Sequence, residues 1–321
     1  MKTLKYSFGL LAMAVIFLSS CRDFVEPAVP YKDFDTGAYL RTISRTSTTF
    51  NFFDLSSSKF ALTLEAVDVE DGKTVQTVEV RVRHRRLIPG VGLRYTPATD
   101  VVVKTLQAAD FKPNTTSRFM RPSFEVTAAE ALAAVGLTAA GINGGDVFEF
   151  RLVLNDKFGR RFSSDNVTTN VAGAPFYDSP FQYPVSVVCP VATTFGVGTY
   201  SLKQTAGGAD PFFGNATRFV EENVTLAAVA GNSTQRVFTV KYLGGFVTRP
   251  FTVEFSCGKI IKPKESAGVG CAGTTIFWVS DNANLSNYAP TSDKTITINF
   301  VDDSDSSCGI KAPVQFTLTK I

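Results

Sequence analysis

The chain has 321 residues and a mass of 34.7 kDa, which is room for about two domains of roughly 100–200 residues each. Hydrophobic residues make up 44% of it and charged residues 19%, a composition that excludes a chain disordered throughout. Its 32 basic and 29 acidic residues leave a formal net charge of +3, which disfavours general nucleic-acid binding. The one histidine, His84, excludes a histidine-rich zinc site.

The amino terminus has the pattern of a secretory signal. Lys2 and Lys5 precede an apolar run over residues 8–18, which is too short for a transmembrane helix. The run ends in Leu18-Ser19-Ser20-Cys21, which resembles the lipobox of bacterial lipoproteins. This resemblance implies that residues 1–20 are a signal peptide and that Cys21 carries the lipid. The alternative is an ordinary signal peptide followed by an accidental cysteine.

Residues 21–30 are interpreted as a short lipidated tether. Asp23 and Glu26 follow Cys21 closely, and this acidic pair resembles the surface-export signals of Bacteroidota lipoproteins. The resemblance implies an outer-membrane protein, anchored by lipid, at the cell surface rather than on the periplasmic face. No other segment of the sequence reaches the ~18 consecutive apolar residues that a spanning helix needs. The expected contact with the membrane is therefore the N-terminal lipid.

Four further cysteines lie in the C-terminal part: Cys189, Cys257, Cys271 and Cys308. An even number in an oxidising compartment favours two disulfides, for which three pairings are possible. The pairing that we favour is Cys257–Cys271, closing a short loop, with Cys189–Cys308 joining the start of a domain to its end. A zinc site with four thiolates is the alternative, but the spacing contains no CxxC pair.

The body of the chain has the alternation of an all-β protein. Residues 60–66 and 78–82 alternate around a polar Asp-Gly turn and predict a half-buried hairpin, and residues 148–154 alternate again. These runs predict an Ig-like β-sandwich over residues 31–186. One short helix interrupts it, because residues 127–130 form a capping box and Gly136 ends the helix.

A proline-containing stretch over residues 172–190 predicts a domain boundary near residue 187. Beyond it, alternating segments follow one another to the end of the chain. They predict an up-and-down sandwich or small barrel over residues 187–321, stapled by the cysteines. The expected strands cover residues 200–204, 219–227, 237–242, 251–257, 274–279, 295–301 and 314–318.

A wider resemblance rests on the lipobox, the tether, the Ig-like strands and two sequence runs. The runs are residues 126–150, from Val126 to Phe150 in the strand after Gly145-Asp146, and Cys189-Pro190 with the later Gly198-Thr199-Tyr200. Together they resemble Bacteroidota surface lipoproteins associated with starch-utilisation (Sus) type nutrient-uptake loci. The resemblance implies a role in nutrient capture at the cell surface, with an outer-membrane importer complex as a partner. It identifies no ligand.

Trp278 heads the best candidate for a ligand site. It is the only tryptophan, and the polar segment after it holds Asn282, Asn284 and Tyr288. Exposed aromatic rings stack on the apolar faces of sugars, and amides supply hydrogen bonds, so the segment predicts a glycan site. The alternative is a core tryptophan followed by an ordinary asparagine-rich loop.

Charged segments offer two further kinds of site. His84 lies in a run of arginines over residues 81–86, which suits an anionic ligand or lipopolysaccharide, although a solvated strand face is favoured. Two acidic stretches have alternating oxygen ligands of the kind that bind calcium, but polar turns are favoured and no metal is expected. Their acidic residues are Asp68, Glu70 and Asp71 in one stretch, and Asp302, Asp303 and Asp305 in the other.

The sequence contains no GxSxG, HExxH, P-loop or dinucleotide-binding pattern, so neither catalysis nor a cofactor is predicted. The sequence predicts a lipid-anchored protein of the cell envelope. We expect it to act as a binding or accessory protein that supports the capture of a nutrient such as a glycan. A structural or adhesive surface protein is the first alternative. A hydrolase with a pair of carboxylates is the second, because such a site needs only two acidic residues.

Overall fold

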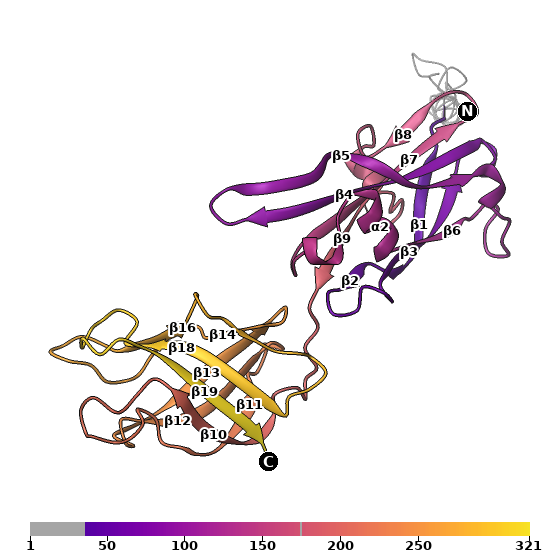
Figure 1. Cartoon of the computed structure of the whole chain (residues 1–321). Helices are drawn as coiled ribbons and strands as arrows, with labels where there is room; N and C mark the ends of the chain where they lie inside the picture. The colour runs from indigo at the N-terminus through magenta and orange to yellow at the C-terminus, as the bar shows by residue number, and fades with distance from the viewer. Residues whose placement is uncertain (1–35, 174) are drawn as a thin grey trace, which may run out of the picture.

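The computed structural model describes residues 36–173 and 175–321, and strands dominate it. The prediction of an all-β fold is therefore confirmed. Its strands form a sandwich in the N-terminal part and one long, curled sheet in the C-terminal part (Figure 1). The predicted signal peptide (residues 1–20), Cys21 and the tether (residues 21–30) lie outside the described residues and stay predictions. Within the described ranges, no helix is long and apolar enough to cross a bilayer.

Two sheets make the N-terminal sandwich. One has the order β1-β3-β6 and the other β2-β9-β7-β4-β5, with β8 paired to β7. Alternate apolar side chains of both sheets meet between them, and Phe60 of β3 stacks on Phe150 of β7 at 4.4 Å between ring centroids. The strands are β1 (Tyr39–Ser47), β2 (Thr49–Asn51), β3 (Lys59–Val67), β4 (Val75–Ile88), β5 (Gly92–Gln107), β6 (Ser123–Thr127), β7 (Val147–Asp156), β8 (Arg161–Ser163) and β9 (Gln182–Val188).

The hairpin predicted for residues 60–82 is wrong, although both of its strands exist with the predicted alternation. β3 pairs with β1 and β6, whereas β4 pairs with β5 and β7, so the chain between them crosses from one sheet to the other. Asp68 fixes this crossing by accepting hydrogen bonds from the backbone N–H groups of Glu70, Gly72 and Thr74. The alternation of a strand records its buried face but not its neighbour, which explains the error.

The predicted helix forms as α2 (Ala128–Ala134). Its capping box is complete, because Thr127 Oγ1 accepts from the Glu130 N–H at 3.1 Å and Glu130 Oε2 accepts from the Thr127 N–H at 2.7 Å. Gly136 ends it with a φ of 69°, a conformation that favours glycine. The other helical turns are η2 (Ala108–Asp110), η3 (Ala139–Gly141) and α3 (Thr169–Ala172).

Ten strands form the C-terminal sheet, in the order β15-β16-β18-β19-β10-β11-β12-β13-β14-β17. The sheet curls back on itself, because Glu265 of the edge strand β15 accepts a hydrogen bond from the backbone of Thr252 in β13 at 3.0 Å. The strands are β10 (Gly198–Ala206), β11 (Glu222–Ala228), β12 (Gln235–Tyr242), β13 (Val247–Ser256), β14 (Lys259–Ile261), β15 (Glu265–Ser266), β16 (Phe277–Ser280), β17 (Ser286–Asn287), β18 (Thr295–Asp302) and β19 (Ala312–Lys320).

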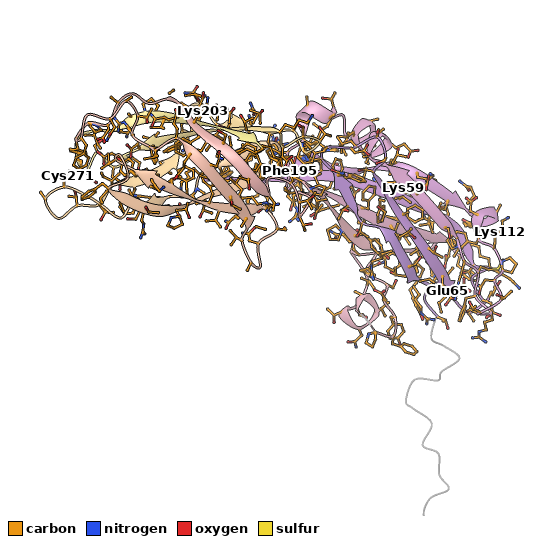
Figure 2. The ribbon with its side chains drawn as sticks, turned by 90° about the horizontal axis from the view of Figure 1, so that it is seen from below. Lys59, Glu65, Lys112, Phe195, Lys203 and Cys271 are labelled. Carbon is orange, nitrogen blue, oxygen red and sulfur yellow. A yellow bond between two sulfur atoms is a disulfide. The ribbon has the colours of Figure 1, made fainter. Side chains whose placement is uncertain are left out.

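Each part of the chain has its own hydrophobic core. The first core extends from Ala38 to Val187 and the second from Phe195 to Leu318, so the chain passes between them just after β9. The two parts lie end to end, with Phe195 near the junction and Cys271 at the free end of the C-terminal part (Figure 2). The domain boundary expected near residue 187 stays a prediction and falls within β9.

Close contacts join the two parts at this junction. The rings of Phe53 and Tyr288 meet edge to face at 6.0 Å. Gly144, in the loop before β7, lies directly against the disulfide Cys189–Cys257: a Cβ atom on it would lie 1.8 Å from Cys257 Sγ. Glycine is therefore the residue that permits this approach.

The favoured disulfide pairing is wrong. The bonds are Cys189–Cys257, at the junction, and Cys271–Cys308, at the free end. Cys257 follows β13 at the junction, and the chain then runs the length of the sheet before it reaches Cys271 (Figure 2). Cysteines that are near in sequence therefore lie at opposite ends of the domain, beyond the 7 Å or so that a disulfide spans.

Candidate functional site

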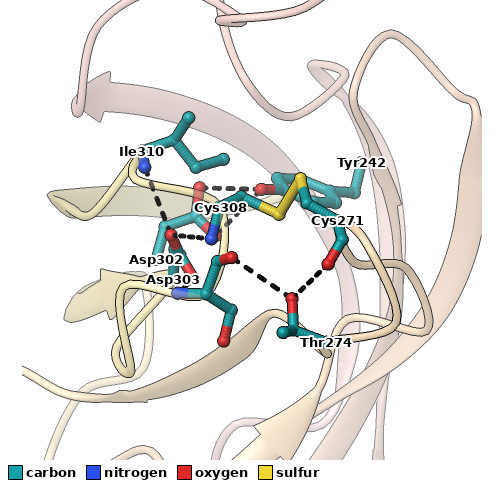
Figure 3. The surroundings of a disulfide bond; sticks show 8 residues. Tyr242, Cys271, Thr274, Asp302, Asp303, Cys308 and Ile310 are labelled. Atoms are coloured by element: carbon teal, nitrogen blue, oxygen red, sulfur yellow. Dashed lines mark hydrogen bonds between the residues drawn. A yellow bond between two sulfur atoms is a disulfide. The ribbon is translucent and has the colours of Figure 1, made fainter.

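A buried carboxylate organises the free end of the C-terminal domain. Asp302, at the end of β18, has no exposed surface. It accepts hydrogen bonds from Arg218 Nη1 at 2.7 Å and Trp278 Nε1 at 3.0 Å. A third comes from Tyr242 Oη at 2.9 Å, and Figure 3 shows this contact beside the disulfide. We call these four residues the distal hub. They come from the strands β12, β16 and β18 and from the loop after β10. The hub therefore joins β12 to β16 and β18, two strands with which β12 shares no backbone ladder.

Burial dominates the electrostatics of the hub. It raises the pKa of Asp302, and the hydrogen bonds from Arg218 and Tyr242 oppose this rise without cancelling it. Burial also raises the pKa of the Tyr242 hydroxyl, which keeps it a hydrogen-bond donor. The attraction between Asp302 and Arg218 thus offsets only part of the free energy that their desolvation costs. Removing one of the two would nevertheless leave the charge of the other buried without a partner.

Arg218 carries the hub into the surrounding loops. Its Nε donates to the carbonyl of Gly207 at 3.0 Å, and its Nη1 donates to the carbonyl of Ile310 at 2.9 Å. Its backbone N–H donates to Gln204 Oε1 at 2.9 Å. One guanidinium therefore holds both the loop after β10 and the loop before β19.

The loop before β19 is fixed a second time by its disulfide and by Asp303. The Asp303 carboxylate accepts from the backbone N–H groups of Ser307, Cys308 and Ile310 (Figure 3). Thr274 Oγ1 donates to the carbonyl of Cys271 at 2.6 Å, on the other side of the disulfide. The acidic stretch thus forms a structural turn stapled to the neighbouring loop.

The other carboxylates of the two acidic stretches also have protein partners. Asp305 pairs with Lys264, Glu70 with Lys157 and Asp71 with Arg118. In the described part of the chain, no group of three or more His, Cys, Asp or Glu side chains is arranged to hold a metal ion.

Three phenylalanines are exposed above the hub, and we call them the distal tip: Phe212, Phe213 and Phe246. Phe213 is 57% exposed and Phe246 67%, and their rings lie 5.4 Å apart at an interplanar angle of 32°. Phe212 and Phe213 belong to the loop after β10, and Phe246 to the turn between β12 and β13. Exposed rings that contact each other across two loops form an apolar platform.

The loops under the distal tip are rigidly built. Asp210 accepts from the backbone N–H groups of Phe212 and Phe213 and from the Asn215 amide at 2.7 Å. Gly244 has a φ of 64°, and a Cβ on it would lie 2.2 Å from Asn215 Nδ2, so the two loops touch where only glycine fits. Burial would raise the pKa of Asp210, but its hydrogen bonds outweigh this and lower it.

The predicted glycan site does not assemble. Trp278 has no exposed surface and points into the hub, so it cannot stack on a sugar. Tyr288 lies at the domain junction against Phe53 and Phe195. Asn284 lines a shallow groove beside β18 and β19, and Asn282 is exposed in a turn outside it. The place of Trp278 in an alternating strand was the sequence signal that it belongs to the core. For the distal tip, the sequence signal was the presence of aromatic residues within turns.

The arginine run around His84 is not a free basic surface. Arg81 pairs with Asp100, Arg83 and Arg85 pair with Glu149, and Arg86 pairs with Asp146. His84 itself is 3% exposed rather than on a solvated face. The favoured interpretation as a solvated strand face is thus wrong for the histidine.

A charged cleft of about 300 Å³ on the N-terminal sandwich bears on the hydrolase alternative. It contains Asp100, Glu149 and Asp165 together with Arg83 and Arg151. Burial would raise the pKa of Asp100, but hydrogen bonds from Arg151 and Arg81 outweigh it and lower the pKa. A general acid needs the opposite shift, so Asp100 is unsuited to that role.

No protein-family model matches this chain, and no curated protein matches it significantly. Among solved structures, the sporulation control protein Spo0M of Bacillus subtilis is 11% identical, with 87% of this chain and 90% of that one covered and a TM-score of 0.26. An adhesin of Mobiluncus mulieris with disulfide, isopeptide and ester cross-links is 15% identical, with 89% and 92% covered and a TM-score of 0.21. Superpositions this loose carry no argument about fold or function.

The distal hub makes a direct prediction. Asp302→Asn leaves the Arg218 guanidinium buried without its counter-charge, so we expect the free energy of unfolding of the C-terminal domain to fall by about 3–5 kcal/mol. Urea unfolding followed by the fluorescence of the single tryptophan, which lies in the hub, measures it.

Asp305→Asn is the matched control, because this carboxylate forms an exposed pair with Lys264 and its loss should leave the free energy of unfolding nearly unchanged. A loss below about 1 kcal/mol for Asp302→Asn would show that the hub is not what holds this end together.

Proposed function

We propose that this protein is a lipid-anchored component of the cell envelope that binds an extracellular ligand with the distal tip and supports nutrient capture. The Leu18-Ser19-Ser20-Cys21 sequence supports the anchor. The pairing of the other four cysteines supports an oxidising compartment. Lipid acyl chains contribute about 0.8 kcal/mol per buried CH₂, so two or three chains give stable anchoring.

The arrangement of the two domains suits this role. β1 begins at Tyr39 and runs toward the junction, where β2 and Phe53 follow, so the chain enters the N-terminal domain at the end away from the junction. The distal tip lies at the end of the C-terminal domain that is away from the junction (Figure 1). An anchor before Tyr39 would therefore leave the distal tip as the part farthest from the membrane.

The single observation that carries the proposal is the exposed pair Phe213 and Phe246 on rigid loops. Each Å² of apolar surface on these rings that a ligand removes from water contributes about 25 cal/mol to binding. Flat rings of this kind stack on the C–H faces of sugars or pack into an apolar pocket of a partner. Because the loops are already ordered, binding would sacrifice little conformational entropy.

A second candidate is a structural or adhesive role, and the hairpin of β4 and β5 favours it. This hairpin extends beyond the sandwich (Figure 1) and carries Leu87, Val91 and Leu93 exposed near its end. Val91, in the turn, is 80% exposed. Apolar side chains on a projecting hairpin are suited to packing against another protein.

Anchoring is tested by Cys21→Ala. We expect the wild-type protein, expressed in a bacterium that processes lipoproteins, to take up labelled palmitate and to partition into detergent, and the variant to do neither. Retention of the variant in the detergent phase would contradict the lipid anchor.

Ligand binding is tested on a glycan array with the chain from Arg22 to Ile321. Binding that falls at least about tenfold in the double variant Phe213→Ser/Phe246→Ser supports the distal tip. Phe158→Ser is the matched control, because Phe158 is an equally exposed ring on the other domain. Binding that survives the double variant would remove the tip from the proposal.

Binding to no glycan would favour the second candidate, a structural or adhesive role. That role is tested by capture of an outer-membrane importer with the wild-type protein and with Val91→Ser.

A further inference from the structure

A small cavity at the base of the β4–β5 hairpin joins basic and apolar side chains. Its volume is about 200 Å³, room for roughly seven water molecules at 30 Å³ each. His84, Arg86 and Arg94 line it, and so do Ile88 and Leu137. It belongs to the N-terminal domain and shares no residue with the distal tip.

Strand register explains why these residues meet. Val80 and Val82 of β4 point into the core, and the same face continues past the edge of the core with His84, Arg86 and Ile88. In the antiparallel pair, His84 lies opposite Thr96 and Arg86 lies opposite Arg94. The loop after α2, with Leu137, covers the other side of the cavity.

His84 has one ring nitrogen satisfied and one free. Its Nε2 lies 2.8 Å from Asp146 Oδ2, and the ring is 3% exposed, but its Nδ1 has no hydrogen-bond partner among the described residues. A carboxylate accepts hydrogen bonds, so the ring nitrogen that faces Asp146 is the one that donates, and Nδ1 is the nitrogen left without a partner. Buried polar atoms without a partner are rare and call for an explanation.

The two arginines of the cavity differ in whether their guanidinium groups already have hydrogen-bond partners. Arg86 is engaged by Asp146 and by the carbonyl of Gly141 at 2.8 Å. Arg94 is exposed, and its side chain makes no hydrogen bond or ion pair with any described residue. The cavity therefore combines one free guanidinium, one imidazole nitrogen without a partner, and an apolar wall.

We propose that this cavity binds a small sugar acid, with its carboxylate on Arg94, a hydroxyl hydrogen-bonded to His84 Nδ1 and its C–H face on Ile88 and Leu137. A guanidinium binds a carboxylate through two parallel hydrogen bonds. A simple inorganic anion would use the guanidinium and leave the apolar wall in water. The site accepts a free sugar acid or the end of an acidic polysaccharide, since both present the same groups.

The single histidine makes a direct experiment possible. In an untagged chain from Arg22 to Ile321, the ring nitrogens of His84 are the only imidazole signals in a long-range ¹H–¹⁵N spectrum. We expect titration with galacturonate to move the Nδ1 signal and to saturate. Arg94→Gln should weaken this binding at least about tenfold, because it removes a charged hydrogen-bond donor.

Arg118→Gln is the matched control, because it removes an exposed arginine of the same domain far from the cavity and should leave binding unchanged. Tighter binding of oligogalacturonate than of the monomer would identify a polysaccharide end as the source. The Phe213→Ser/Phe246→Ser variant should bind as the wild type does, which separates this site from the distal tip.

Three results would overturn the proposal: an Nδ1 signal that does not move with either uronate, an equal response to neutral galactose, or an equal response to inorganic phosphate. The first would mean that water satisfies Nδ1, and the others that carboxylate or sugar is not what the cavity recognises.

Discussion

The contact between Asp302 and Arg218 is the constraint on which the free end of the molecule depends. A buried carboxylate with three donors cannot be satisfied unless β12, β16, β18 and the loop after β10 all reach it. The polar requirement is strict because the desolvated charge of either partner alone is costly. The hydrogen-bond network around Asp302 therefore fixes the positions of the loops that carry the distal tip. Hydrophobic burial has no direction and would not fix these positions by itself.

Much of the strand content could be predicted from the sequence, because alternation reports burial directly. The helix α2 was predictable from its ends, since the side chains of Thr127 and Glu130 each bond the other's backbone N–H locally. The partner of β3 was not, because pairing depends on contacts distant in sequence. The disulfides failed for the same reason: the separation of Cys257 and Cys271 along the chain says nothing about which ends of a sheet they occupy.

The candidate sites were less predictable than the fold. Trp278, the only tryptophan, was predicted to stack on a sugar. It lies instead on the buried face of an alternating strand, where its Nε1 donates to Asp302. The phenylalanines of the distal tip occur in turns, between Asp210 and Gly214 and after Gly245, where burial is not enforced. The free Nδ1 of His84 depends on Asp146, which is distant in sequence, so no local pattern contained it.

Amide hydrogen exchange tests the central claim most directly. If the distal hub positions both loops, Asp302→Asn should speed exchange in residues 207–217 and 303–311 together, while residues 36–187 exchange as in the wild type. Exchange that is unchanged in these loops, or faster only in residues 303–311, would contradict the claim that one buried carboxylate holds the distal tip in place.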